Sequence, residues 1–357
     1  MSGLPSLQGP VCPLPINNHA QIVIGHGSGG IMTHALIRDV FKKHLGNDVL
    51  NAGNDAALID VAEQLQEGQR LVVSMDAHIV SPLFFPGGDI GRLSVCGTVN
   101  DVAMMGADVK SLTASFILEE GLLLSELESI VISMAQACEE AGVRIVAADT
   151  KVVEKGAADK LFISTTGIGY APTQRVIAGD RARKGDAVLV SGSLGNHGIA
   201  VAQARGNLGF QSSVISDCAP LNHMIAELLK EVPVVHVLRD PTRGGLATTL
   251  VEIANQSEVT IELEEKNIPV DPVVRTACEL LGLDPLYLAN EGKVIIILPQ
   301  AHAEKALEIL RHQPYGLQAA LIGQVKEQGS PRLVLRTPFG TTRVLEMLAS
   351  EMLPRIC

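Results

Sequence analysis

The sequence has no tryptophan and only 3% aromatic residues, so it offers few flat side chains on which nucleic-acid bases could stack. Its formal net charge is -11, whereas a protein that grips a nucleic-acid backbone carries clustered basic residues. Both features argue against a nucleic-acid partner. They do not argue against ATP, because magnesium and backbone amides can hold a nucleotide on an acidic protein.

Closely spaced cysteines are also missing. The cysteines stand at positions 12, 96, 138, 218, 278 and 357, and none belongs to a C-x-x-C pair. Zinc-knuckle and thioredoxin-type motifs are therefore excluded. We expect the four cysteines at 96, 138, 218 and 278 to be small core residues of a protein in a reducing compartment.

Long hydrophobic runs are absent as well. The longest runs, such as VIIIL at 294–298, suit buried strands and are too short to cross a bilayer. The first 20 residues have neither the basic start nor the apolar run of a signal peptide. These features predict a cytoplasmic protein without a membrane segment.

The composition that is present indicates a packed globular protein of two domains, because hydrophobic residues make up 46% of 357 residues. Alternating strand and helix patterns predict an α+β protein with two mixed α/β domains and a break near 171–185. The predicted organisation is a loose lead-in over 1–20, a dimerising first domain over 21–170, a second domain over 171–345 and a mobile tail over 346–357.

Local patterns place several elements. They predict strands over 70–76 and 143–153, a helix within 87–107 that starts on glycines, and an amphipathic helix over 124–142 that ends on glycine. In the second half they predict helices over 198–206, 220–230 and 246–255.

Four aspartates in the first half lie at predicted strand ends or beside small residues: Asp55, Asp76, Asp101 and Asp149. Strand ends are where α/β folds bind ligands. Converging carboxylates repel one another unless a cation lies between them, and magnesium bridges carboxylates to phosphates. Each aspartate alone is better explained as a helix cap or turn former, but that explanation weakens for four together.

Glycine-rich loops at 26–30, 86–91, 191–198 and 240–246 would let backbone amides approach an anion. None of them matches the P-loop pattern, and glycine also simply forms turns. Arg243 in the last loop could contact a phosphate or could equally be a solvated surface residue.

Two residues are candidates for proton transfer. Lys151 follows Asp149 by two positions, which places both on one strand face. Glu291 lies in the polar stretch LANEGKV between apolar segments. Burial or crowding could move the pKa of either group toward neutrality, although a salt bridge or a turn is the simpler explanation.

The chain ends on PRIC, which puts a thiol on a terminus that should be mobile. Together with HGSGG, PLFFPGGDIGRLSVCGTVNDVAMMGA, DTKVV, RDPTRGGLA and ANEGK, this ending resembles the HypE family of hydrogenase maturation factors, which are carbamoyl dehydratases. The resemblance runs from about residue 21 to the last residue. More distantly, the chain resembles aminoimidazole ribonucleotide synthetase, selenophosphate synthetase and thiamine-monophosphate kinase, in which ATP and magnesium lie in a cleft of an α+β homodimer.

The resemblance implies a reaction. Cys357 would accept a carbamoyl group from a HypF-type carbamoyltransferase partner, and ATP would drive dehydration of this thiocarboxamide to a thiocyanate. The cyano group would pass through a HypC–HypD-type scaffold complex to the iron of a nickel–iron hydrogenase. The terminal segment would then act as a swinging arm.

The resemblance also implies residue roles. Cys357, Lys151 and Glu291 would be catalytic, and the magnesium ligands would be Asp55, Asp76, Asp101 and Asp149. The residues that bind ATP would be those four aspartates with Asn100, Thr150, Asp240 and Arg243.

Two alternatives remain open from the residues. A small-molecule kinase or synthetase of the same superfamily would explain the aspartates and glycines and would leave PRIC an accident. A metal-handling protein would use Cys357 and some of the ten histidines, but these are scattered without ligand spacing.

Overall fold

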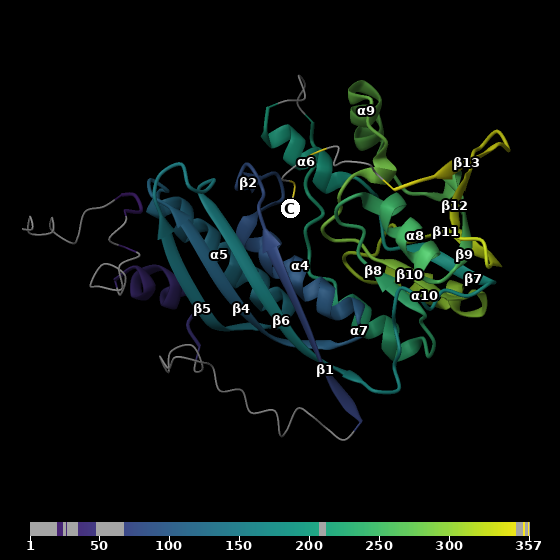
Figure 1. Cartoon of the computed structure of the whole chain (residues 1–357), viewed down its shortest axis with the longest axis horizontal. Helices are drawn as coiled ribbons and strands as arrows, with labels where there is room; N and C mark the ends of the chain where they lie inside the picture. The colour runs from purple at the N-terminus through teal and green to yellow at the C-terminus, as the bar shows by residue number, and fades with distance from the viewer. Residues whose placement is uncertain are drawn as a thin grey trace, which may run out of the picture.

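The computed structural model describes residues 20–23, 26, 35–47, 68–206, 212–347, 353 and 356. Two β-sheets lie on opposite sides of the molecule, and helix α4 (Ile90–Met104) lies between them (Figure 1). In the described part of the chain, every helix is too short or too polar to cross a membrane.

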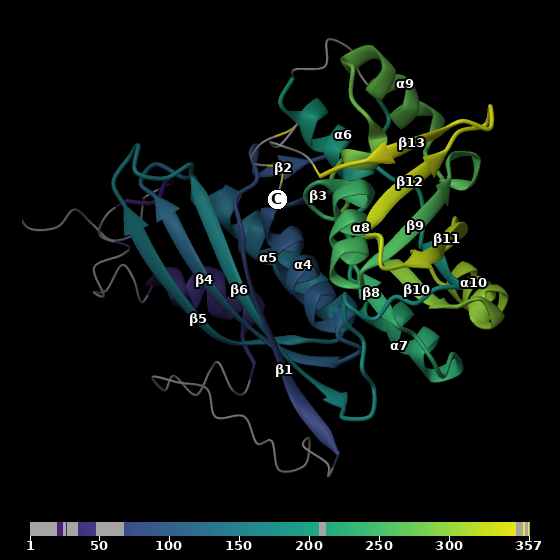
Figure 2. The same ribbon diagram turned by 45° about the vertical axis from the view of Figure 1, so that its right-hand side comes forward.

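The first sheet has four strands in the order β1-β6-β4-β5, of which β4 and β5 run parallel and the other neighbours antiparallel. The strands are β1 (Gln69–His78), β4 (Asp108–Glu119), β5 (Arg144–Val153) and β6 (Leu161–Pro172). Helices α4 and α5 (Leu124–Ala141) lie on one side of these strands (Figure 2). Alternating residues of β1 on the opposite face remain exposed, namely Leu71, Val73 and Met75. We call this uncovered side the open face of the sheet.

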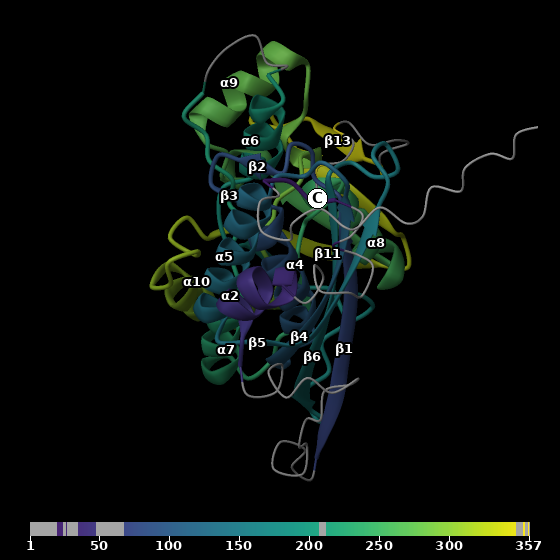
Figure 3. The same ribbon diagram turned by 90° about the vertical axis from the view of Figure 1, so that its left-hand side faces the viewer.

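The helical layer extends outward from α5. The short helices η2 (Ile37–Lys42) and α2 (Lys43–Leu45) pack against α5 and lie in front of it in Figure 3. Their buried residues, including Phe41, belong to the same hydrophobic core as α4 and α5. The ring of Phe41 lies 4.8 Å from that of Phe116 on β4, centroid to centroid, so this layer also reaches the sheet.

Helix α4 is the central element of the fold. It begins after Asp89, whose side chain accepts backbone hydrogen bonds from the first turn. Glycines let it pack closely on both sides: a Cβ at Gly91 would lie 2.3 Å from the Ile130 carbonyl oxygen of α5, and one at Gly97 would lie 3.0 Å from His78 Cε1 of β1. Nearly every residue of α4 is therefore buried.

The second sheet has seven strands in the order β13-β12-β9-β11-β7-β10-β8. The strands are β7 (Asp186–Val190), β8 (Val237–Arg239), β9 (Val259–Glu264), β10 (Ile295–Pro299), β11 (Ala320–Gln328), β12 (Arg332–Arg336) and β13 (Thr342–Leu345). All neighbours are antiparallel except β12 and β9. The longer helices around it are α6 (Asn196–Ala204), α7 (Asn222–Glu231), α8 (Gly245–Gln256), α9 (Pro272–Leu281) and α10 (Ala303–Arg311). β7 and β10 are buried along most of their length, as the run VIIIL predicts.

The predicted α+β class is confirmed by these two sheets. The expectation that Asp76 and Asp149 end their strands is wrong. Strand β1 stays paired with β6 as far as His78, and β5 stays paired with β4 as far as Val153, so both aspartates lie inside continuous ladders. Asp55 lies outside the described residues.

Candidate active site

A cleft of 420 Å³ lies between the two domains. It is lined by Val72, Val73, Ser74, Asp101, Met104, Met105, Arg239, Asp240, Thr242, Arg243, Thr249 and Glu252. Asp101 comes from α4 and Asp240 directly follows β8. Asp76 of β1 is not a lining residue, but it lies close enough to Asp101 and Asp240 for its charge to act on both.

The three aspartates of this cleft interact electrostatically. Burial and the charge of Asp76 raise the pKa of Asp101, although a hydrogen bond of 2.8 Å from Ser74 Oγ opposes the shift. Burial, together with the charges of Asp101 and Asp76, raises the pKa of Asp240 to about 7. Carboxylates that raise one another's pKa in this way are stabilised by a cation.

The donor set of the cleft fits magnesium. Asp76, Asp101 and Asp240 supply hard oxygen atoms, and magnesium takes one or two carboxylates together with water and substrate phosphates. Within the described ranges, no group of three or more acidic, histidine or cysteine side chains could hold an ion unaided. Arg239 and Arg243 line the same cleft, and their positive charges are complementary to the negative charge of a phosphate.

Asp149, Thr150 and Lys151 lie elsewhere on the first sheet. The ladder register joins Asp76, through β6 and β4, to Ala148, so the side chain of Asp149 points to the opposite face. Lys151 Nζ lies 2.7 Å from Asp149 Oδ2, which confirms that the two share a strand face. Within one chain, the side chains of Asp149 and Asp76 therefore lie on opposite faces of the sheet. The predicted magnesium role of Asp149 stays a prediction.

Asn100, predicted to bind the nucleotide, fastens α4 to the second domain. Its Nδ2 donates to the Ala219 carbonyl oxygen at 3.0 Å, and its Oδ1 accepts from Leu221 N at 2.8 Å. The side chain is buried, so both ends of the amide are occupied. Its predicted contact with ATP stays a prediction.

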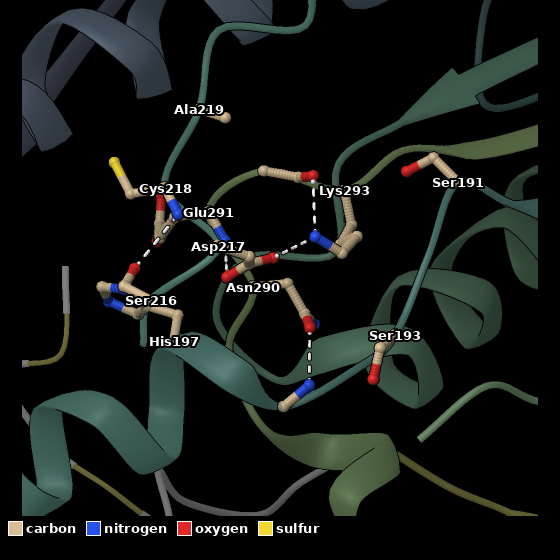
Figure 4. Close-up of polar contacts among 12 residues, drawn as sticks. Ser191, Ser193, His197, Ser216, Asp217, Cys218, Ala219, Asn290, Glu291 and Lys293 are labelled. Carbon is tan, nitrogen blue, oxygen red and sulfur yellow. Dashed lines mark hydrogen bonds and ion pairs between the residues drawn. The ribbon is translucent and has the colours of Figure 1, made fainter. Parts of the chain in front are cut away.

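A second group of polar side chains lies in the interior between the domains. We call it the interior cluster, and its members are His197, Ser216, Asp217, Asn290, Glu291 and Lys293 (Figure 4). They come from three segments far apart in sequence: the start of α6, the loop before α7 and the loop before β10. Gly292 permits the contact between two of these segments, because a Cβ there would lie 1.8 Å from the Asp217 carbonyl oxygen.

Asp217 and Lys293 form an ion pair inside the cluster. Lys293 Nζ lies 3.0 Å from Asp217 Oδ2, and both side chains are nearly inaccessible to solvent. Burial alone would raise the pKa of Asp217, but the charge of Lys293 opposes burial and the pKa of Asp217 is lowered. The Glu291 backbone N donates to Asp217 Oδ1 at 3.3 Å. The pair thus fixes the backbone at Glu291.

Glu291 is the second acidic side chain of this cluster. Its side chain is buried, and its Oε1 atom has no hydrogen-bond partner. Burial, followed by the charges of Asp240, Asp217 and Asp76, raises the pKa of Glu291 well above its ordinary value. A carboxyl group of this kind exchanges a proton far more readily near neutral pH than an exposed one.

The end of the chain reaches the interior cluster. The Ile356 side chain is only 3% exposed, and its carbonyl oxygen accepts a hydrogen bond of 2.8 Å from His197 Nε2. Leu353 packs against neighbouring hydrophobic residues. Cys357 lies outside the described residues, but it is joined directly to Ile356.

His197, Ser216, Asp217 and Lys293 were not among the residues predicted from the sequence. His197 was read only as part of a glycine loop, and Lys293 only as part of the quoted motif ANEGK. A signal was available in SDCAP, where polar Ser216 and Asp217 directly precede small residues that are buried.

Comparison with known families defines the class of protein. Residues 53–171 match the model of the N-terminal domain of AIR synthase related proteins, and residues 183–336 match the model of their C-terminal domain. The chain is therefore an AIR synthase related protein of two domains. Thiamine-monophosphate kinase from Stenotrophomonas maltophilia, with 20% identity and a TM-score of 0.63, covers 85% of this chain and 96% of its own, which shows the shared fold alone.

Closer relatives define the particular family. Carbamoyl dehydratase HypE of Cupriavidus necator is 52% identical over 345 residues, which cover 97% of each chain. HypE of Escherichia coli K12 is 45% identical over 336 residues, covering 94% of this chain and 99% of its own. A crystal structure of HypE in complex with ATP is 51% identical, with a TM-score of 0.89, over 94% of this chain and 99% of the other. The chain belongs to the HypE family of carbamoyl dehydratases.

Proposed function

We propose that this protein is an ATP-dependent carbamoyl dehydratase that acts on its own C-terminal cysteine during nickel–iron hydrogenase maturation. The substrate is the thiocarboxamide on Cys357, and the product is a thiocyanate that supplies the cyanide ligand of the active-site iron. The observation that carries the proposal is the seating of Ile356 beside the interior cluster, which holds Glu291. Ile356 is bonded to His197 of this cluster, and the thiol-bearing residue follows Ile356 in the sequence.

The reaction needs a better leaving group than an amide oxygen. Transfer of the γ-phosphoryl group of ATP to the carboxamide oxygen forms a C–O–P linkage and leaves ADP. Loss of both N–H protons and of phosphate then forms the carbon–nitrogen triple bond. Magnesium, when bound, neutralises charge on the phosphates. Asp76, Asp101 and Asp240 are proposed to hold the metal and the nucleotide in the cleft, and Arg239 and Arg243 lie there to contact phosphate oxygens.

Glu291 is proposed to take an N–H proton from the tail. Its raised pKa makes its carboxylate a stronger base than an exposed glutamate, and its unpartnered Oε1 is available to a substrate. The Asp217–Lys293 ion pair holds the Glu291 backbone in place. Lys151, exposed and paired with Asp149, is proposed to act from the open face, where it would meet a second chain.

We propose that the first domain forms a homodimer through that open face. Leu71, Val73 and Met75 are more than half exposed along β1, and Ile117 of β4 is also exposed. A contiguous apolar face of this kind is typical of an interface. Pairing of two such faces would bring Asp149 and Lys151 of one chain toward the other chain, which the ladder register of a single chain does not do.

The partners and compartment complete the proposal. A crystal structure of a HypE–HypF complex contains a chain 47% identical to this one, with a TM-score of 0.76 and coverage of 88% of this chain and 100% of that chain. We propose a HypF-type carbamoyltransferase and a HypC–HypD-type scaffold complex as partners, in the cytoplasm. The four described cysteines are free and buried, in agreement with a reducing compartment.

The experiment is mass spectrometry of the C-terminal peptide after incubation with the carbamoyltransferase, with and without ATP. We expect a carboxamide mass on Cys357, followed by the ATP-dependent loss of one water. Cys357→Ala should abolish both products and leave the fold and ATP binding intact. A label on Cys96, Cys138, Cys218 or Cys278 instead, or ATP turnover that persists in Cys357→Ala with a small-molecule acceptor, would favour the kinase alternative.

A further inference from the structure

The contact between His197 and the chain end is built from three hydrogen bonds in series. His197 Nε2 lies 2.8 Å from the Ile356 carbonyl oxygen, and His197 Nδ1 lies 2.8 Å from Ser216 Oγ. Ser216 Oγ also accepts from Cys218 N at 3.1 Å. All three side chains, and that of Ile356, are buried.

Burial lowers the pKa of His197 and favours the neutral imidazole, for which the series allows only one arrangement of protons. A carbonyl oxygen only accepts, so His197 Nε2 carries the hydrogen. The Ser216 hydroxyl accepts from Cys218 N and donates its own hydrogen to Nδ1. The neutral imidazole therefore has its one donor directed at the Ile356 carbonyl oxygen.

Both domains hold the imidazole in this orientation. The Phe85 ring meets it edge to face, with ring centroids 5.2 Å apart. Ser216 N donates to the Pro86 carbonyl oxygen at 2.7 Å, and a Cβ at Gly87 would lie 2.8 Å from Ser216 N. Ser216 is thus clamped against the first domain, and His197 against Ser216. The seat for the chain end is preorganised rather than formed by a flexible side chain.

We propose that His197, oriented by Ser216, is the positioning residue that seats the carbamoylated chain end for dehydration. This inference rests on the proposed function. The residue does not touch the reacting group; it holds the Ile356 carbonyl so that the next residue lies at the interior cluster. Loss of this hydrogen bond would shift the arm toward the released state, in which the carbamoyltransferase can reach it.

The size of the effect follows from a single buried hydrogen bond. Its loss shifts the ratio of seated to released arms by about threefold to tenfold, because a net contribution of this kind is modest. Leu353 and the Ile356 side chain still contribute apolar contacts, so the arm is not expected to be released completely.

Two amide substitutions test the roles of the two imidazole nitrogen atoms individually. In His197→Gln the amide nitrogen reaches the position of Nε2 and can still donate to Ile356. In His197→Asn the shorter amide ends near the position of Nδ1 and leaves the Ile356 carbonyl without a donor. The matched control is His236→Asn, because His236 is also buried and also makes a 2.7 Å contact through Nδ1, with Asp186, but does not contact the chain end.

The first measurement is the rate of Cys357 alkylation by iodoacetamide, followed in the nucleotide-free full chain by mass spectrometry of the C-terminal peptide. We expect His197→Asn to raise the rate by about threefold to tenfold, and His197→Gln and His236→Asn to stay within twofold of wild type. Thermal melting identifies the variants that are folded, and only their alkylation rates are compared. Equal rates for His197→Asn and wild type, or equally raised rates for the Asn and Gln variants, would overturn the proposal.

The second measurement follows the reaction. His197→Asn should accept the carbamoyl group at the wild-type rate but lose water about threefold to tenfold more slowly, and His197→Gln should recover most of that loss. A defect in carbamoylation with normal dehydration would refute the assigned step. If wild type itself showed no dehydration, the proposed function would fail, while the alkylation rates would still decide whether His197 seats the chain end.

Discussion

Glu291 should make the protein less stable as the pH rises, and Glu291→Gln should remove this dependence. In the unfolded chain a glutamate has a pKa of about 4.3, as in short peptides. In the folded chain burial and neighbouring charges raise the pKa of Glu291, so the folded state keeps the proton to higher pH. Above the unfolded pKa, folding then takes up a proton, and stability falls as the pH increases.

The magnitude follows from one proton. Between the two pKa values the free energy of unfolding should fall by about 1.4 kcal/mol per pH unit relative to Glu291→Gln, which cannot ionise. The difference between the two proteins should therefore grow with pH in favour of the Gln variant, up to the pH at which Glu291 ionises in the folded chain. Titrating groups that are distant from Glu291 are present in both proteins and cancel in the difference.

Urea unfolding followed by circular dichroism at several pH values measures this difference, at a fixed protein concentration and without nucleotide. Glu308→Gln is the control, because Glu308 is exposed on α10. The difference in free energy of unfolding between this variant and wild type should not change with pH. Parallel stability curves for wild type and Glu291→Gln would show that Glu291 does not bind an extra proton on folding, and the reasoning about its environment would be wrong.

Two further predictions concern the cleft and the open face. Asp76→Asn removes a carboxylate that raises the pKa of Asp101 and Asp240; calorimetry should show at least tenfold weaker magnesium-dependent ATP binding, and unchanged affinity would rule Asp76 out as a ligand. Met75→Asp places a charge on a side chain that is 72% exposed on the open face; sedimentation should show monomers where wild type forms dimers, and an intact dimer would place the interface elsewhere.

The parts of this molecule that could be predicted from sequence depend on short-range patterns. Period-two spacing placed Asp149 and Lys151 on one strand face, and the helical spacing within 87–107 predicted α4. The positions of Asp76 and Asp149 within their strands could not be predicted in this way. Where a strand ends depends on its pairing with a neighbouring strand, which the sequence of a single segment does not reveal.

The interior cluster is harder to predict because its contacts are distant in sequence. Asp217 and Glu291 are 74 residues apart, and His197 and Ile356 are 159 apart. Glu291 could be identified from its polar stretch between apolar segments, but nothing near Ile356 indicates that a terminal residue is buried. Only the packing of two domains brings these groups together.

The attachment of α4 to the loop before α7 bears on how the molecule moves. Asn100 bonds to Ala219 and Leu221, Arg92 Nε donates to the Cys218 carbonyl oxygen at 2.9 Å, and Ser216 N bonds to Pro86. The first domain therefore holds the segment that lines one wall of the interior cluster. A hinge between the domains would have to break these buried bonds together, so the two domains should travel as one body. Delivery between enzymes then falls to a few terminal residues, and the distance over which they carry their cargo is set by the length of the arm.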